Sequence, residues 1–166
     1  MTLISMTFLP PLTGLIEDLV ADDLLQAIEV VPDEFFSSAN LAQAHEELGD
    51  KLGHFRLPYS FHFVSNSLCS ADFLENHDPG LTNLRGNYQP ILTSDHLTCS
   101  RIGNQDVTGN IPTLYTNETL DITVENIRHY QERINNNSPF LLEHIPMPFE
   151  LRNSTMSWDE FYLGLI

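Results

Sequence analysis

Three side chains that can bind a metal ion fall near the ends of short apolar segments of this sequence. They are His62 in Tyr-Ser-Phe-His-Phe-Val, His96 after Ser-Asp, and Glu143 in Phe-Leu-Leu-Glu-His. Two imidazoles and one carboxylate form the ligand set typical of non-haem iron(II) sites, in which further positions stay open for oxygen and substrate. Zinc accepts the same ligands, so the set alone leaves the metal open.

These three residues can meet only if a sheet brings their segments together. Short apolar runs alternate along the chain with longer segments of helical period, which is typical of parallel βα units. The expected strands are 4–9, 27–31, 59–64, 91–96 and 140–145. The expected helices are 12–25, 41–52, 119–134 and 157–165, of which 119–134 has the clearest helical period and 41–52 a weaker one. The strands read as apolar on both faces, as in buried parallel sheets. Since ligands collect at the C-terminal ends of parallel strands, we expect the three residues at one edge.

Each candidate also has an ordinary structural interpretation. A histidine in an apolar strand is more often a core or rim residue bonded to the backbone than a metal ligand. A carboxylate is different, because burying it unpaired is costly. Glu143, and Glu29 in Ala-Ile-Glu-Val-Val, therefore each need a cation, a metal ion or a proton. Asp95 and His144 are neighbours of the candidate ligands, and His144 should point to the opposite face from Glu143 if the strand continues.

Composition limits the partners and the compartment. The 166 residues predict one domain, and 7 Lys and Arg against 23 Asp and Glu give a net charge of -16. Polyanions are repelled at long range, so neither nucleic acid nor an anionic membrane surface is an expected partner. The sequence has two cysteines outside any CxxC spacing, no signal peptide, and no apolar stretch long enough to span a membrane. These features favour the cytoplasm as the compartment.

Five segments around these residues follow an ordered pattern. They are HFVSNSLCSAD (62–72), SDHL (94–97), IPTLYTNETL (111–120), LLEH (141–144) and TMSWDEF (155–161). The set resembles the multinuclear iron-containing family typified by the methanobactin-biosynthesis oxidase, in which Glu stands in place of Asp95 and Asn in place of His144. The second-strand segment with Glu29 is similar to that family more weakly.

The resemblance implies a barrel similar to xylose isomerase that holds two or three iron ions. It implies that His62, His96 and Glu143 are iron ligands, with Glu143 bridging, and that Glu29, Asp95 and His144 surround the metal or substrate. The implied reaction is oxidative modification of cysteine in a ribosomally made peptide, which a partner protein delivers. The chain matches only the N-terminal part of the family, and no residue is assigned a catalytic role.

We therefore expect an α/β fold, an incomplete (β/α)8 TIM-type barrel of about five parallel βα units in a single domain over residues 1–166. Its open edges predict self-association. The enzyme hypothesis is an iron-dependent oxidoreductase that needs the missing strands. Two alternatives remain: a non-catalytic remnant or binding module on this fold, and a zinc or manganese hydrolase or isomerase of the xylose-isomerase type.

Overall fold

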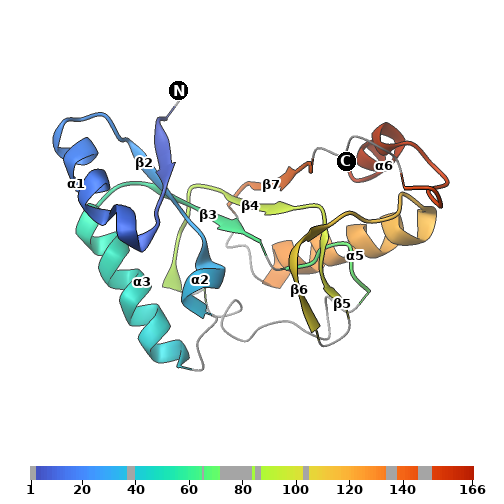
Figure 1. Ribbon diagram of the computed structural model, residues 1–166, viewed down its shortest axis with the longest axis horizontal. Helices are drawn as coiled ribbons and strands as arrows, with labels where there is room; N and C mark the ends of the chain where they lie inside the picture. The colour runs from blue at the N-terminus through green and yellow to red at the C-terminus, as the bar shows by residue number, and fades with distance from the viewer. Residues whose placement is uncertain are drawn as a thin grey trace.

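A five-stranded parallel sheet forms the centre of the protein (Figure 1). The computed structural model describes residues 3–36, 40–64, 66–71, 84, 87–102, 105–133, 138–145 and 151–166. The strands lie in the order β1 (Ser5–Thr7), β2 (Ala27–Val30), β3 (Tyr59–Phe63), β4 (Thr93–His96) and β7 (Phe140–Glu143), and each pairs in parallel with the next. The predicted fold class, a partial TIM-type arrangement of parallel βα units, is confirmed.

Helices follow the strands along the chain, and side-chain caps fix where two of them begin. They are η1 (Pro10–Leu12), α1 (Thr13–Ala21), α2 (Pro32–Phe36), α3 (Leu41–Phe55), α5 (Asn117–Arg133) and α6 (Trp158–Gly164). The Asn40 side chain accepts a hydrogen bond from the Gln43 N–H at the start of α3. Ser157 and Glu160 form a capping box at the start of α6. These polar side chains satisfy N–H groups that the first helical turn leaves unpaired.

The hydrophobic core lies on the side of the sheet that faces α1, α3 and α5. Side chains alternate between the two faces of a strand, so Phe61 and Phe63 of β3 point the same way. Both are at most 2% exposed. Tyr130 of α5 is fully buried against Phe63, with the ring centroids 5.7 Å apart, and Leu48 of α3 joins the same cluster. This packing holds the backbone of β3 in place on both sides of His62.

The opposite face of the sheet is polar, which differs from the expectation of strands apolar on both faces. Register pairs Thr7 with Glu29, Glu29 with Ser60, His62 with Ser94, and His96 with Glu143. Cross-strand partners point to the same side, so these residues share one surface, which we call the polar face. An eight-stranded barrel would enclose such a surface, and in this structure it carries the candidate metal ligands.

A two-stranded antiparallel sheet, made of β5 (Cys99–Ile102) and β6 (Gln105–Ile111), was not predicted. It follows β4 directly along the chain (Figure 1). The sequence did carry a signal, since Gly103-Asn104 separates the two runs by two residues of hairpin type. The polar β6, QDVTGNI, has no apolar run of the kind that a search for buried parallel strands selects.

Candidate metal centre

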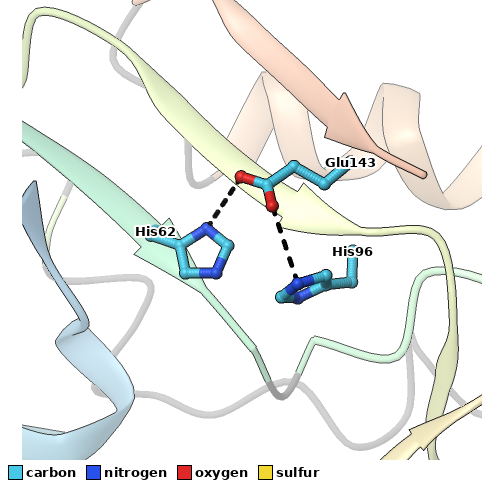
Figure 2. A group of neighbouring side chains, drawn as sticks. All are labelled: His62, His96 and Glu143. Carbon is cyan, nitrogen blue, oxygen red and sulfur yellow. Dashed lines mark ion pairs between the residues drawn. The ribbon is translucent and has the colours of Figure 1, made fainter. Parts of the chain in front are cut away.

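The sheet register brings the three predicted ligands together at the C-terminal ends of their strands. His62 lies in β3, and His96 and Glu143 are the last residues of β4 and β7. His96 pairs directly with Glu143, and Ser94, two residues earlier in β4, pairs with His62. Figure 2 shows the three side chains pointing toward one another from three adjacent strands.

The carboxylate of Glu143 lies between the two imidazoles. Its Oε1 is 3.2 Å from His62 Nδ1, and its Oε2 is 3.6 Å from His96 Nε2. The two rings meet edge to face, with centroids 4.8 Å apart. One donor atom from each residue lies within 4.8 Å of the others. A metal ion bonded at about 2.1 Å holds neighbouring donors roughly 3.0 to 3.4 Å apart, so the donor set fits a divalent ion with small side-chain adjustments.

The electrostatics of the cluster favour a neutral His96. Burial, helped by the neighbouring His62, lowers the pKa of His96, while Glu143 opposes this shift less strongly. A metal binds the neutral imidazole, so a lowered pKa extends metal binding by His96 to lower pH. The Nδ1 atom of His96 is buried and has no hydrogen-bond partner among the described residues. Glu143, with 44% of its side chain exposed, opens the cluster to solvent and substrate.

Ser94 positions the His62 ring, a role that the sequence did not reveal. Its Oγ lies 2.8 Å from His62 Nδ1, the same nitrogen that faces Glu143. One ring nitrogen cannot accept a hydrogen bond and bind a metal ion with the same lone pair. Metal binding through Nδ1 therefore requires the Ser94 hydroxyl to turn away. The available signal was spacing, because Ser94 stands two residues before His96 and so shares its face.

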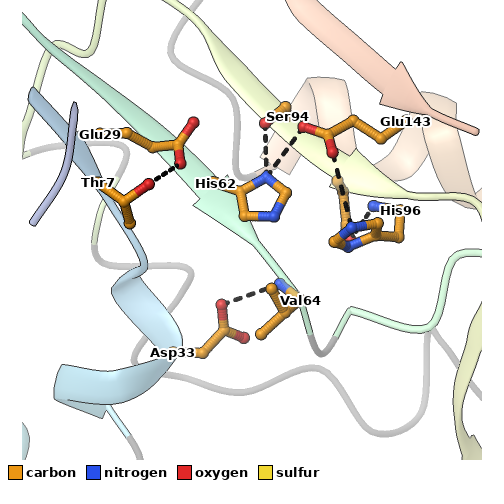
Figure 3. A network of polar contacts seen from close by, with 9 residues as sticks. Thr7, Glu29, Asp33, His62, Val64, Ser94, His96 and Glu143 are labelled. Atoms are coloured by element: carbon orange, nitrogen blue, oxygen red, sulfur yellow. Dashed lines mark hydrogen bonds and ion pairs between the residues drawn. The ribbon is translucent and has the colours of Figure 1, made fainter. Parts of the chain in front are cut away.

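Glu29 lies on the polar face but outside the three-residue cluster (Figure 3). Thr7 Oγ1 donates a hydrogen bond of 2.7 Å to Glu29 Oε1, across the β1–β2 pair. Glu29 comes from β2, on the other side of β3 from Glu143. Glu29 therefore shares the face of the cluster, and no hydrogen bond or ion pair joins it to His62 or His96 among the described residues.

Asp95 lies on the opposite face of the sheet from its neighbour His96. It pairs in register with the core residue Phe63 and is 1% exposed. Burial raises the pKa of Asp95 well above its usual value. Two hydrogen-bonding groups lower that pKa less strongly: the nearby Asn66 side chain, and the His96 N–H, which donates to Oδ1 at 2.6 Å. In the described part of the chain, neither Asp95 Oδ2 nor Asn66 Nδ2 has a hydrogen-bond partner with good geometry. Asp95 therefore points away from the polar face and contacts His96 only through the backbone N–H of that residue.

His144 follows the end of β7 and packs on α6. Its ring centroid is 5.6 Å from that of Trp158 and 5.2 Å from that of Tyr162. Phe161, on the buried side of the same helix, is fully buried. His144 therefore holds α6 against the end of β7, and it does not join the cluster of His62, His96 and Glu143.

The two cysteines, both free, should differ in reactivity. Burial raises the pKa of the Cys69 thiol to about 12 and also raises that of the less buried Cys99. We expect iodoacetamide at pH 8 to label Cys69 at least about a thousandfold more slowly than an unfolded thiol, since the thiolate is the nucleophile. Mass spectrometry of the native and urea-unfolded chain checks this. Labelling of native Cys69 at the unfolded rate would contradict its burial.

The fold and the site together define a parallel α/β protein of partial TIM type with a His-His-Glu cluster at its strand ends. Comparison with known families matches residues 13–166 to the family described as RiPP precursor modification enzyme MbnB/TglH/ChrH. The chain belongs to this family. Among the residues that the structure describes, none of the helices has the length and apolar character needed to cross a membrane.

Several curated relatives carry the description UPF0276 protein. One from Psychromonas ingrahamii is 30% identical over 105 residues, which are 63% of this chain and 36% of the relative. One from Vibrio vulnificus is 28% identical over 138 residues, 82% of this chain and 45% of the relative. One from Paraburkholderia phytofirmans is 31% identical over 110 residues. This chain thus aligns with less than half the length of these relatives.

Proposed function

We propose that His62, His96 and Glu143 bind iron, and that this centre takes part in oxidative modification of cysteine in a ribosomally made precursor peptide. The observation that carries the proposal is the convergence of three donor residues, with atoms within 4.8 Å of one another, at the strand ends. The family description, a RiPP precursor modification enzyme, supports a peptide substrate. A delivery protein for that peptide and a cytoplasmic location complete the proposal.

The chain's own residues have distinct tasks in this proposal. His62 and His96 each offer a ring nitrogen; the Ser94 hydroxyl orients the His62 ring before metal binds and turns away if Nδ1 becomes the ligand. Glu143 directs one oxygen toward each histidine, so it would hold a metal together with them and, if two ions bind, would be the ligand that they share. Bound iron supplies the one-electron chemistry that side chains lack. The half-exposed Glu143 and the 51% exposed Leu141 leave the centre accessible to a peptide.

Iron loading tests the ligand assignment. The purified chain is dialysed anaerobically against iron(II), and bound iron is measured for wild type, His62→Ala and His54→Ala. His54 is a matched control because it pairs with Glu17 at 2.8 Å on the exposed surface. It therefore forms a His–carboxylate pair that lies outside the cluster of His62, His96 and Glu143. We expect His62→Ala to lose most of the bound iron and His54→Ala to keep it. Equal binding by all three would refute the assignment.

Oxygen consumption separates an enzyme from a non-catalytic binding module on this fold. The iron-loaded chain is mixed with a cysteine-containing precursor peptide, and oxygen uptake and peptide mass are followed together. The proposal predicts uptake that depends on the peptide and on His62, with a matching change in peptide mass. Peptide binding without oxygen uptake would favour the binding module, and hydrolysis with zinc or manganese would favour the hydrolase alternative.

A further inference from the structure

A cavity of about 390 Å³ lies outside the metal centre, among η1, α2 and the first turns of α3. Pro10, Phe35 and the buried Ala44 give it apolar walls. The carboxylates of Glu34 and Glu47 lie at its rim, where both residues are exposed. Its remaining lining residues, Asn40 and Gln43, are polar and uncharged. The cavity therefore combines an apolar floor with an acidic mouth.

The topology places this cavity on the same edge of the sheet as the metal centre. The segment η1 begins shortly after β1 ends, and α2 begins shortly after β2 ends. Both lie at the C-terminal ends of parallel strands, as do His62, His96 and Glu143 at the ends of β3, β4 and β7. In parallel α/β folds this edge binds ligands. A single extended ligand can therefore contact the cavity and the centre from one side of the sheet.

Charge selects the kind of group that the cavity can hold. Residues 1–50 include ten Asp and Glu and no Lys or Arg, because all 7 basic residues of the chain lie beyond them. The N-terminus of α3 adds about half a positive charge, which two carboxylates outweigh. An anionic ligand would be repelled at this mouth, whereas a cation on an apolar stem would match both the rim and the floor.

We propose that the cavity binds a lysine or arginine side chain of the precursor peptide. The aliphatic stem packs against Phe35 and Ala44, and the cationic head lies between Glu34 and Glu47. This inference rests on the proposed function, because it takes the peptide substrate from there. It adds a specificity site on the β1–β2 side of the sheet, where the peptide is held by a basic residue while another part of it reaches the centre.

Fluorescence anisotropy on the full chain, without metal, tests this site. The probe is a fluorescein-labelled, cysteine-free peptide with three lysines, compared with the same peptide carrying three glutamines. We expect the lysine peptide to bind more tightly at low salt, and the double variant Glu34→Gln, Glu47→Gln to raise its Kd about tenfold. The matched control is Glu46→Gln with Asp50→Asn, which removes two exposed charges of α3 outside the cavity. It should change Kd less than twofold.

Equal losses in the two double variants would overturn the site, since binding would then follow net charge alone. Equal binding of the lysine and glutamine peptides would also overturn it. Iron loading of the same proteins keeps this result separate from the proposed function. The cavity variant should bind iron like wild type, and His62→Ala should bind the lysine peptide like wild type, so either assignment can fail by itself.

Discussion

Changing Glu143 to Gln is expected to lower the iron(II) affinity of the chain by at least about a hundredfold. The change keeps the size of the side chain and removes its charge. It replaces one of the two carboxylate oxygens, which lie 3.2 Å from His62 and 3.6 Å from His96, with an amide nitrogen that donates hydrogen bonds. Neither histidine then has an anionic partner among the described residues.

Anaerobic titration with a competing iron chelator measures this affinity. Glu17→Gln is the matched control, because Glu17 also pairs with a histidine, the exposed His54, at 2.8 Å. The control should bind iron as wild type does, and both variants should unfold at the same urea concentration as wild type. A loss of iron affinity as large in Glu17→Gln as in Glu143→Gln would show that iron binds through general surface charge.

Phe61→Ala is expected to lower the free energy of unfolding by about 3 to 5 kcal/mol. Phe61 is 2% exposed, and its ring contacts those of Tyr59, Phe63 and Tyr88. Truncation leaves a void between β3 and the helices that cover it. Since small domains are stable by about 5 to 15 kcal/mol, this loss would remove a large fraction of the chain's stability.

Urea unfolding followed by circular dichroism measures the effect. Phe61→Leu keeps most of the buried volume and should cost about 1 kcal/mol. Leu24→Ala, at a position that is 55% exposed, should cost less than about 0.5 kcal/mol. If Phe61→Ala cost no more than Leu24→Ala, the helix-facing side of β3 would not be the core. In that case His62 would not be held on the polar face.

The five parallel strands could be predicted because their apolar runs are short and separated by helical segments. The predicted strand 59–64 became β3 (Tyr59–Phe63), and 140–145 became β7 (Phe140–Glu143). The hairpin of β5 and β6 escaped prediction because it buries no long apolar run. Helix caps at Ser157 and Asn40 depend on neighbours three residues away, and the Ser157 capping box was accordingly visible in the sequence.

The sequence predicted the ligand residues more readily than their surroundings. A strand face depends on register, and a shift of one residue moves every side chain to the other face. Asp95 and His144, each next to a candidate ligand, therefore point away from the centre, while Ser94 shares the face of His96 and touches His62. The cavity near Phe35 could not be predicted, because Pro10 and residues 34–47, which are far apart in sequence, form it only by packing.

X-ray absorption at the iron edge of the anaerobically loaded chain tests the central claim most directly. Wild type should show the multiple-scattering signal of imidazole ligands, and His62→Ala combined with His96→Ala should lose it while the fold, followed by circular dichroism, persists. Iron surrounded only by oxygen in wild type, or an imidazole signal unchanged in the double variant, would contradict a centre built from His62, His96 and Glu143.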